Sequence, residues 1–327
     1  MLKLSILDQS PISEGMDAET AINNTVELAK LGDKLGYHRF WVSEHHNTDS
    51  FASASPEIFI SCLAAQTKNI KLGTAGILLS HYQPYKIAEQ VSLLSTLYPN
   101  RIDLGIGRAL GGDARIAKAL NSTTNPIEII SKYDSLLNLV YKNKSALKVI
   151  PQTENKPELW ILGTSPASAK YAAEKGLRYS FASFINAEKL VESYQTYHQY
   201  FTPSEFLKEP YTNLSLFALA AETNEEANQL TKSAKKWLID SLLYQKDLPF
   251  PKVTNELENS NSMQEHFLIK MFEEYSAIGT AKEVLEKLES LKKNFAINEF
   301  TLVTITHNQN DKVKSYRLIA EENTHIL

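Results

Sequence analysis

The sequence predicts an α/β fold, and within that class a single TIM (β/α)8 barrel with an insertion between strands seven and eight. Two observations lead to this prediction. Short apolar segments alternate with amphipathic helical segments along nearly the whole chain, which is typical of parallel strands joined by right-handed helical crossovers. Eight strand segments can be counted in the 327 residues, and a count of eight favours a closed barrel over an open sheet.

The predicted strands and helices alternate in the order that a barrel requires. The strands comprise residues 4–7, 39–43, 70–75, 102–106, 159–162, 179–183, 214–220 and 300–304. The helices comprise residues 18–35, 57–67, 87–98, 128–141, 187–201, 281–295 and 311–322, with one more that ends at Gly176. Asp17 suits the N-cap of the first helix, Gly36 the position after its end, and Pro56 the first turn of the second. The helix-capping residues therefore agree with the helix boundaries that the spacing of apolar residues predicts.

One segment interrupts this alternation, between strands seven and eight. Residues 244–262 contain Pro249, Pro251 and the polar run NELENSNS. A long irregular connection in a compact domain is usually either disordered or a functional lid. The residues alone leave both interpretations open.

Composition limits the classes of protein to which the chain can belong. The formal net charge is −4 and the sequence contains no strongly basic run, which argues against a nucleic-acid partner. Cys62 is the only cysteine, so an intramolecular disulfide and a cysteine-based metal cage are excluded. We expect Cys62 to be a buried, inert thiol within the second helix. The chain has no signal-peptide pattern and no stretch of ~18 apolar residues. We therefore predict one domain over residues 1–327, located in the cytoplasm and without membrane contact.

The most distinctive polar block follows strand two and reads Glu44-His45-His46-Asn47. Adjacent residues of an extended chain point to opposite sides, so Glu44 and His46 share one side and His45 lies on the other. One metal ion could not easily bind all three, and the spacing is not that of a zinc protease helix. We predict no metal site. The pattern favours a catalytic histidine near its ordinary pKa, with a structural role or a metal site as weaker alternatives.

Strand three ends in Gly73-Thr74-Ala75-Gly76, whose small residues would allow a flat ligand to approach the backbone, although a tight turn explains them equally well. Strand four places Asp103, Gly105 and Gly107 on one face, and Arg108 follows at its end. An arginine among glycines suits a phosphate or a carboxylate. The glycine pattern of a dinucleotide-binding fold is absent, because Leu110 stands where its third glycine would be.

Strand five is followed by Gly163-Thr164-Ser165-Pro166, which opens a helix. Ser165 suits the N-cap and Pro166 the first helical position. Free N–H groups and hydroxyls at a helix N-terminus bind anions, and a well-capped helix without a ligand is the alternative. Together with Arg108, this turn favours a phosphate site.

Five blocks of sequence resemble the bacterial luciferase-like flavin monooxygenases, especially their uncharacterised single-subunit branch. They are LDQSP, GYHRFWVSEHHN, LGTAGILL, LYPNRIDLGIGRA and LGTSPASAKYAAEKG, and they extend over nearly the whole chain. The resemblance implies a TIM barrel that binds FMN, usually as FMNH2 supplied by a separate flavin reductase, and that uses O2 on a small organic substrate. It also implies a homodimer formed through the helices beside strands two and three.

The resemblance implies roles for individual residues as well. His45 matches the active-site histidine near the reactive carbon of the flavin. Ala75-Gly76 matches a non-prolyl cis peptide under the isoalloxazine ring. The predicted phosphate-binding residues are Arg108, Gly163, Thr164, Ser165 and Ser168. Residues 244–262 match the mobile lid of the family.

Three positions depart from the family pattern. Gly107 stands where the catalytic subunit of luciferase has a reactive cysteine, Thr164 replaces an acidic residue of luciferase, and Leu110 replaces a proline that is common in the closer branch. Nothing in the sequence supports light emission. Aldehydes, sulfonates, amines and S-substituted thiols remain open as substrates. The alternative functions are deazaflavin-dependent hydride transfer, non-catalytic flavin binding and, more weakly, a metal-dependent hydrolase using His45 and His46.

Overall fold

The computed structural model describes residues 1–142, 147–252 and 262–325. Eight parallel strands close into a barrel because the last of them, β10, pairs with both β1 and β8. The barrel strands are β1 (Leu4–Asp8), β2 (Arg39–Val42), β3 (Lys71–Thr74), β5 (Ile102–Gly107), β6 (Glu158–Gly163), β7 (Arg178–Ala182), β8 (Thr212–Ala221) and β10 (Glu299–Val303). The predicted TIM barrel is confirmed, and each predicted strand overlaps an observed one.

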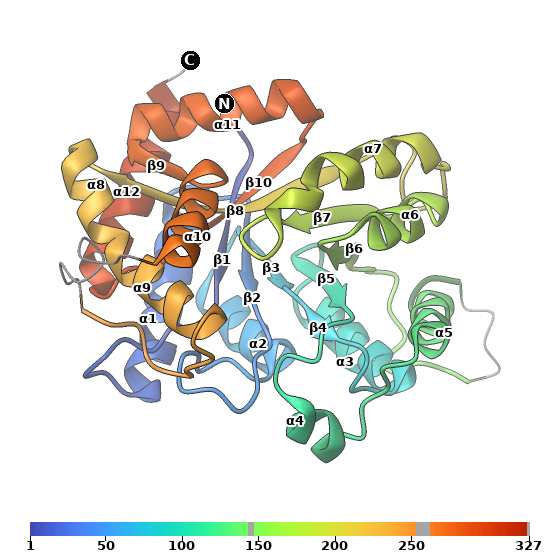
Figure 1. Cartoon of the computed structure of the whole chain (residues 1–327). Helices are drawn as coiled ribbons and strands as arrows, with labels where there is room; N and C mark the ends of the chain where they lie inside the picture. Colours follow the sequence, from blue (N-terminus) through green and yellow to red (C-terminus); the bar gives the residue numbers. More distant parts are fainter. Residues whose placement is uncertain (143–146, 253–261, 326–327) are drawn as a thin grey trace.

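The helices surround the barrel and lie outside its strands (Figure 1). They are α1 (Ala18–Lys34), α2 (Pro56–Gln66), α3 (Pro84–Leu97), α4 (Ala114–Ala119), α5 (Pro126–Leu137), α6 (Pro166–Glu174), α7 (Leu190–Tyr200), α11 (Ala281–Phe295) and α12 (Gln309–His325), with short turns η1 (Asn138–Lys142) and η2 (Ala187–Lys189). Local chemistry explains several helix starts. Asp17 caps α1 by accepting from the Thr20 N–H, and a reciprocal capping box between Thr280 and Glu283 begins α11.

The insertion between the seventh and eighth barrel strands is larger than the sequence indicated. It contains α8 (Asn224–Leu230), α9 (Lys232–Leu242), α10 (Met263–Glu274) and β9 (Ala277–Thr280). Strand β9 pairs with the second half of β8, outside the closed ring, as the short strand β4 (Ile77–Leu78) does with β5. The sequence analysis missed these short elements.

Of the predicted lid, residues 253–261 lie outside the described residues. The part before them, residues 244–252, includes Phe250, which contacts the loop between β1 and α1. Phe250 is fully buried, donates its N–H to the carbonyl of Ile12 and accepts at its own carbonyl from the N–H of Glu14. This part of the insertion therefore packs on the loop between β1 and α1.

Two further expectations can be compared with the structure. Cys62 is exposed on α2, so the expectation of a buried thiol is wrong: its position in the helix faces outward, away from the strands. None of the helices in the described ranges is long and apolar enough to span a membrane.

The barrel interior is divided into layers along its axis. At the N-terminal ends of the strands lies a group of charged side chains, hereafter the floor cluster: Arg39, Lys71, Asp103, Glu158, Arg178 and Glu299. Above it Trp41 and Trp160 pack edge to face, with ring centroids 5.7 Å apart. Beyond the two tryptophans, toward the C-terminal ends, the barrel opens into a cavity lined in part by Trp41. A TIM barrel carries its active site at this end.

Candidate active site

A cavity of about 550 Å³ occupies the C-terminal mouth of the barrel. This volume is within the range of pockets that hold cofactors. The lining includes every predicted cofactor-binding residue: Ala75, Gly76, Arg108, Gly163, Thr164, Ser165 and Ser168. The structure therefore brings together residues that three different segments of the sequence contribute. It also adds residues that sequence reasoning missed, notably Ile129, Tyr133 and Tyr171 on α5 and α6, for which the helical pattern gave no signal beyond core packing.

One end of the cavity is polar and is formed by the turn that opens α6. The Ser165 side chain caps this helix, and the Ser168 hydroxyl donates to the Ser165 carbonyl at 2.7 Å. Gly163 is required here, because a Cβ at this position would lie 2.1 Å from the Ser168 Oγ. The turn thus presents hydroxyls and a helix N-terminus to the cavity, which is the chemistry of an anion site.

Arg108 lies beside this turn and is exposed. Its Nη2 is 3.5 Å from the Ser165 Oγ, and it forms no ion pair with a carboxylate in the described part of the chain. A guanidinium that has no carboxylate partner and lies beside a helix N-terminus can bind a phosphate through two parallel hydrogen bonds, in a bidentate arrangement.

The other end of the cavity is apolar and lies over the end of β3. The Ala75–Gly76 peptide bond is cis, as the resemblance implied, and both residues line the cavity. Leu7, Trp41 and Leu162 complete this wall.

The glycines of β3 and β5 do not all serve a ligand. A Cβ on Gly73 would lie 2.4 Å from the Trp41 ring, and one on Gly105 would lie 2.0 Å from the Thr74 carbonyl oxygen. Neighbouring protein atoms therefore occupy the space beside both glycines. Gly107 does line the cavity. Asp103 shares the face of these glycines, as predicted, but it belongs to the floor cluster and not to the phosphate end.

His45 is not among the residues that line the cavity. It follows β2 just beyond its end, where its Nε2 is 3.1 Å from the Gln9 Nε2 and its ring stacks on Phe51 with centroids 4.4 Å apart. Burial, and to a smaller extent His46, lower the pKa of His45 to about 4. The ring is therefore neutral at physiological pH, and the expectation of a histidine near its ordinary pKa is wrong because burial, with Phe51 stacked on the ring, removes water from it.

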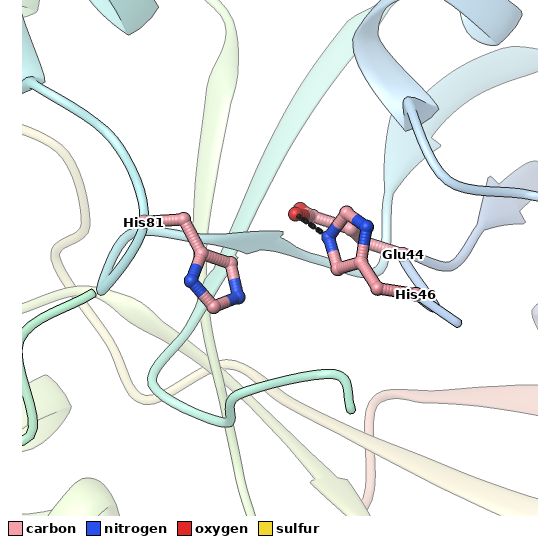
Figure 2. Close-up of side chains that lie close together, drawn as sticks. All are labelled: Glu44, His46 and His81. Carbon is pink, nitrogen blue, oxygen red and sulfur yellow. Dashed lines mark hydrogen bonds and ion pairs between the residues drawn. The ribbon is translucent and has the colours of Figure 1, made fainter. Parts of the chain in front are cut away.

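Glu44 and His46 lie on the opposite side of the chain from His45, as the alternation predicted. Figure 2 shows His46 pointing toward Glu44, with His81 of the neighbouring loop facing the pair. The His46 Nε2 is 2.9 Å from the Glu44 Oε1, which also accepts from the Tyr82 hydroxyl at 2.8 Å. The second Glu44 oxygen accepts from the Leu78 N–H at 2.9 Å. Glu44 thereby fixes Leu78, one of the cavity-lining residues.

These three side chains are close enough for one metal ion, since their ligand atoms lie within 4.8 Å of one another. Each side chain already has protein partners, however. The two nitrogens of His81 contact the Ser122 hydroxyl at 2.5 Å and the Leu110 carbonyl at 3.0 Å. The arrangement is that of a hydrogen-bond network that ties the end of β2 to the loops after β3 and β5.

Comparison with known proteins agrees with this geometry. The model of the luciferase-like monooxygenase family matches residues 2–297. The chain belongs to this family. Two relatives from Bacillus subtilis (strain 168) extend the match: the uncharacterized protein YwcH is 39% identical, over 98% of this chain and 99% of its own, and an N-acetyl-S-alkylcysteine monooxygenase is 36% identical, over 98% of each.

Several solved structures superpose on the whole barrel. The structure of apo-MsnO8 has a TM-score of 0.89 at 31% identity and covers 99% of each chain. The oxygenating constituent of 3,6-diketocamphane monooxygenase from Pseudomonas putida, in complex with FMN, has a TM-score of 0.73 at 18% identity over 98% of each chain. An F420-dependent secondary alcohol dehydrogenase has a TM-score of 0.69 at 14% identity, over 98% of this chain and 97% of its own. At these last two identities the likeness is one of fold alone.

Proposed function

We propose that this luciferase-like protein is an FMN-dependent monooxygenase that uses FMNH2 and O2 to oxidise a small organic substrate. One observation carries the proposal: at the hydroxyl-rich turn of α6 the mouth cavity has the Arg108 guanidinium, which has no carboxylate partner among the described residues, and it has an apolar wall at its other end. A ligand that matches both ends has an anionic tail and a flat apolar body, and FMN has both.

The residues of the cavity fit FMN. Arg108, Ser165 and Ser168 would hold the phosphate, with Gly163 and Thr164 supplying backbone close to it. Ala75 and Gly76 would lie against the isoalloxazine, since no large side chain projects from either of them into the cavity. When bound and reduced, FMN supplies the electrons and the O2 chemistry of the reaction. The protein contributes orientation, exclusion of water and control of protons.

His45 is the proposed proton-handling residue. Its ring is neutral near physiological pH, so it can donate or accept a hydrogen bond without carrying a charge. Residues 244–262 are the proposed lid; residues 253–261 lie outside the described residues, and Phe250 packs against the loop preceding α1.

The proposal includes the setting in which the enzyme works. We infer a cytoplasmic protein that receives reduced flavin from a separate flavin reductase.

We also infer a homodimer formed through α2 and α3, because Ile58, Leu93 and Leu97 of these helices expose large apolar side chains to solvent. Light scattering on the wild type and on Leu93→Glu measures this directly: a dimer that the substitution dissociates supports the inference, and a monomeric wild type contradicts it.

Anaerobic titration with FMNH2, FMN, riboflavin and a deazaflavin tests the cofactor. We expect FMNH2 to bind more tightly than FMN, as a two-component enzyme requires, and riboflavin to bind weakly because it lacks the phosphate. Preference for the deazaflavin would replace the proposal with hydride transfer, a reaction that a protein of the same fold performs. Failure to bind any of the four would overturn it.

A single-turnover experiment tests the reaction itself. The FMNH2-loaded protein is mixed with O2 and a substrate panel that starts with S-alkylated N-acetylcysteines, because a 36% identical relative is named for them. We expect an oxygenated product from one class and a loss of roughly 10²-fold in its rate of formation for His45→Ala. The matched control is His198→Ala, an exposed histidine on α7. Flavin binding without product from any class would favour a non-catalytic flavin-binding protein.

A further inference from the structure

The side chain that faces His45 belongs to the LDQSP block, to which the proposed function gives no task. The Gln9 amide nitrogen lies 3.1 Å from the His45 Nε2. An amide N–H2 group only donates hydrogen bonds, so the imidazole nitrogen that it contacts must accept. An accepting Nε2 leaves the ring proton of neutral His45 on Nδ1. The contact thus selects one of the two tautomers.

Gln9 is held by the residues on either side of it. The Asp8 carboxylate accepts from the Ser10 N–H and the Thr25 hydroxyl, both at 2.8 Å, and from the Lys312 ammonium. The loop that follows is tied to the one after β2, because Ala52 donates its N–H to the Ser10 carbonyl at 3.0 Å. The Gln9 side chain therefore extends from backbone that is fixed with respect to His45.

The face of the His45 ring is fixed as well. Phe51 stacks on it at an interplanar angle of 23°, and Trp237 and Phe250 of the insertion lie behind Phe51 with centroid separations of 5.5 and 5.6 Å. The Trp237 indole donates to the Ser50 hydroxyl at 2.9 Å, which anchors this wall to the same loop. Rotation of the ring would require the wall to move.

Charged groups do not compete for the Gln9 contact. On its own chain segment, His46 slightly lowers the pKa of His45, but His46 lies on the opposite side of the chain, next to Glu44. From the insertion, the Asp247 carboxylate accepts from the Thr48 hydroxyl at 2.6 Å and the Asp49 N–H at 3.0 Å. From β1, the Asp8 carboxylate is paired with Lys312. In the described part of the chain, the His45 Nδ1 has no hydrogen-bond partner.

We propose that Gln9 is a positioning residue that holds His45 as the Nδ1-protonated tautomer, so that Nδ1–H, which has no hydrogen-bond partner in the described part of the chain, is the donor that His45 can offer. The catalytic consequence rests on the proposed function, whereas the tautomer itself does not. It implies that His45 supplies a hydrogen bond or a proton through Nδ1 while Gln9 keeps Nε2 occupied. Gln9 acts through His45 and touches no reacting atom in this scheme.

Nitrogen-15 NMR of histidine-labelled, ligand-free protein tests the tautomer without any flavin. The chain has eight histidines, and the His45 signals are assigned by their loss in His45→Gln. We expect the wild-type Nδ1 at a protonated-type shift and Nε2 at an unprotonated-type shift. Gln9→Leu should give a mixture of tautomers or the reverse one. Gln195→Leu, an exposed glutamine on α7, is the control and should leave the wild-type pattern.

Gln9→Glu should favour the opposite tautomer of His45 and so provides a second test. A carboxylate would accept from Nε2–H, reversing the tautomer, and would raise the pKa of His45 above its value of about 4. A wild-type Nε2–H tautomer, or a Gln9→Leu spectrum identical to wild type, would overturn the proposal. Spectra of backbone amides show whether each variant is folded.

Single-turnover kinetics then separates the positioning role from the proposed function. We expect Gln9→Leu to slow product formation by about tenfold, a part of what an acid–base residue contributes, with the Kd for FMNH2 within about twofold of wild type. A changed tautomer with unchanged kinetics would overturn the positioning role and leave the flavin proposal intact. An enzyme that binds no flavin would fail the proposed function while the tautomer result stands.

Discussion

Two arginines at opposite ends of the same barrel differ in nearly every contact they make. Arg39, the first residue of β2, is buried and forms ion pairs with Asp103, with Glu158 at 2.8 Å and with Glu299 at 3.0 Å. Arg108, just beyond the end of β5, is exposed and contacts the Ser165 hydroxyl at 3.5 Å. The two guanidinium groups have the same charge and shape, so the difference lies in their surroundings.

The floor cluster compensates its own charge. Lys71 and Arg178 join Arg39 on the cationic side and both approach Glu158, so three cations face three carboxylates. The ion pairs of this cluster are made within the barrel itself, so we assign the cluster a structural role. Among the described residues, no carboxylate compensates the charge of Arg108 at the mouth, and a bound anion would do so. Pairing of charges thus distinguishes the N-terminal end of this barrel from the end at which we propose that the ligand binds.

Arg39→Met gives the largest expected effect. The substitution keeps the length of the side chain but leaves Asp103 and Glu299 buried without their principal cation. We expect a loss of about 3–5 kcal/mol in the free energy of unfolding, or failure to fold. Urea denaturation of the variant measures it. Arg115→Met, at an exposed arginine on α4, is the control and should change stability by less than about 0.5 kcal/mol. An Arg39→Met protein as stable as wild type would show that the floor cluster is dispensable.

Arg108→Ala gives the next largest effect, in binding and not in stability. A lost charge-assisted hydrogen bond is worth about 1.5–3 kcal/mol, which corresponds to roughly 10- to 100-fold in Kd for FMN. Riboflavin affinity should not change, because riboflavin has no phosphate, and Tm should stay within about 1 °C. Titration calorimetry with both flavins checks this, with Arg115→Ala as the control. Equal weakening of FMN and riboflavin would assign Arg108 to the ring and not to the phosphate.

The comparison also indicates what sequence could and could not provide. Alternation correctly placed Asp103 on the same face as Gly107, and the glycine-rich context of Arg108 correctly indicated the mouth. Sequence reasoning could not assign Asp103 to the floor cluster, because its partner Arg39 is 64 residues away and Glu299 is 260 residues from Arg39. The lowered pKa of His45 was missed for the same reason: Trp237 and Phe250, behind Phe51, come from a distant insertion.

Acidification should remove the contribution of Glu158 to the stability of the floor cluster. Burial raises the pKa of Glu158, but Arg39, Arg178 and Lys71 together outweigh it and lower that pKa to about 2, from an ordinary value of 4.5. Because the folded-state pKa is the lower one, this contribution is present above pH 4.5 and is lost as pH falls toward 2. We expect a loss of about 1–2 kcal/mol from Glu158 over this window. Urea denaturation at several pH values should show a shallower acid dependence for Glu158→Gln than for wild type, and identical slopes would contradict the assignment.

Thr164→Val is the smallest expected effect and tests where the anion site ends. Thr164 lines the cavity next to Ser165 but replaces an acidic residue of luciferase, and in the described part of the chain its hydroxyl has no hydrogen-bond partner. If the hydroxyl contacts the phosphate, removal of one hydrogen bond should raise the Kd for FMN by about two- to tenfold, corresponding to 0.5–1.5 kcal/mol. Ser168→Ala is the matched comparison, because that hydroxyl already donates to the Ser165 carbonyl and its loss should also disturb the turn. A Thr164→Val protein with wild-type FMN affinity, beside a weakened Ser168→Ala, would confine the phosphate site to Arg108, Ser165 and Ser168.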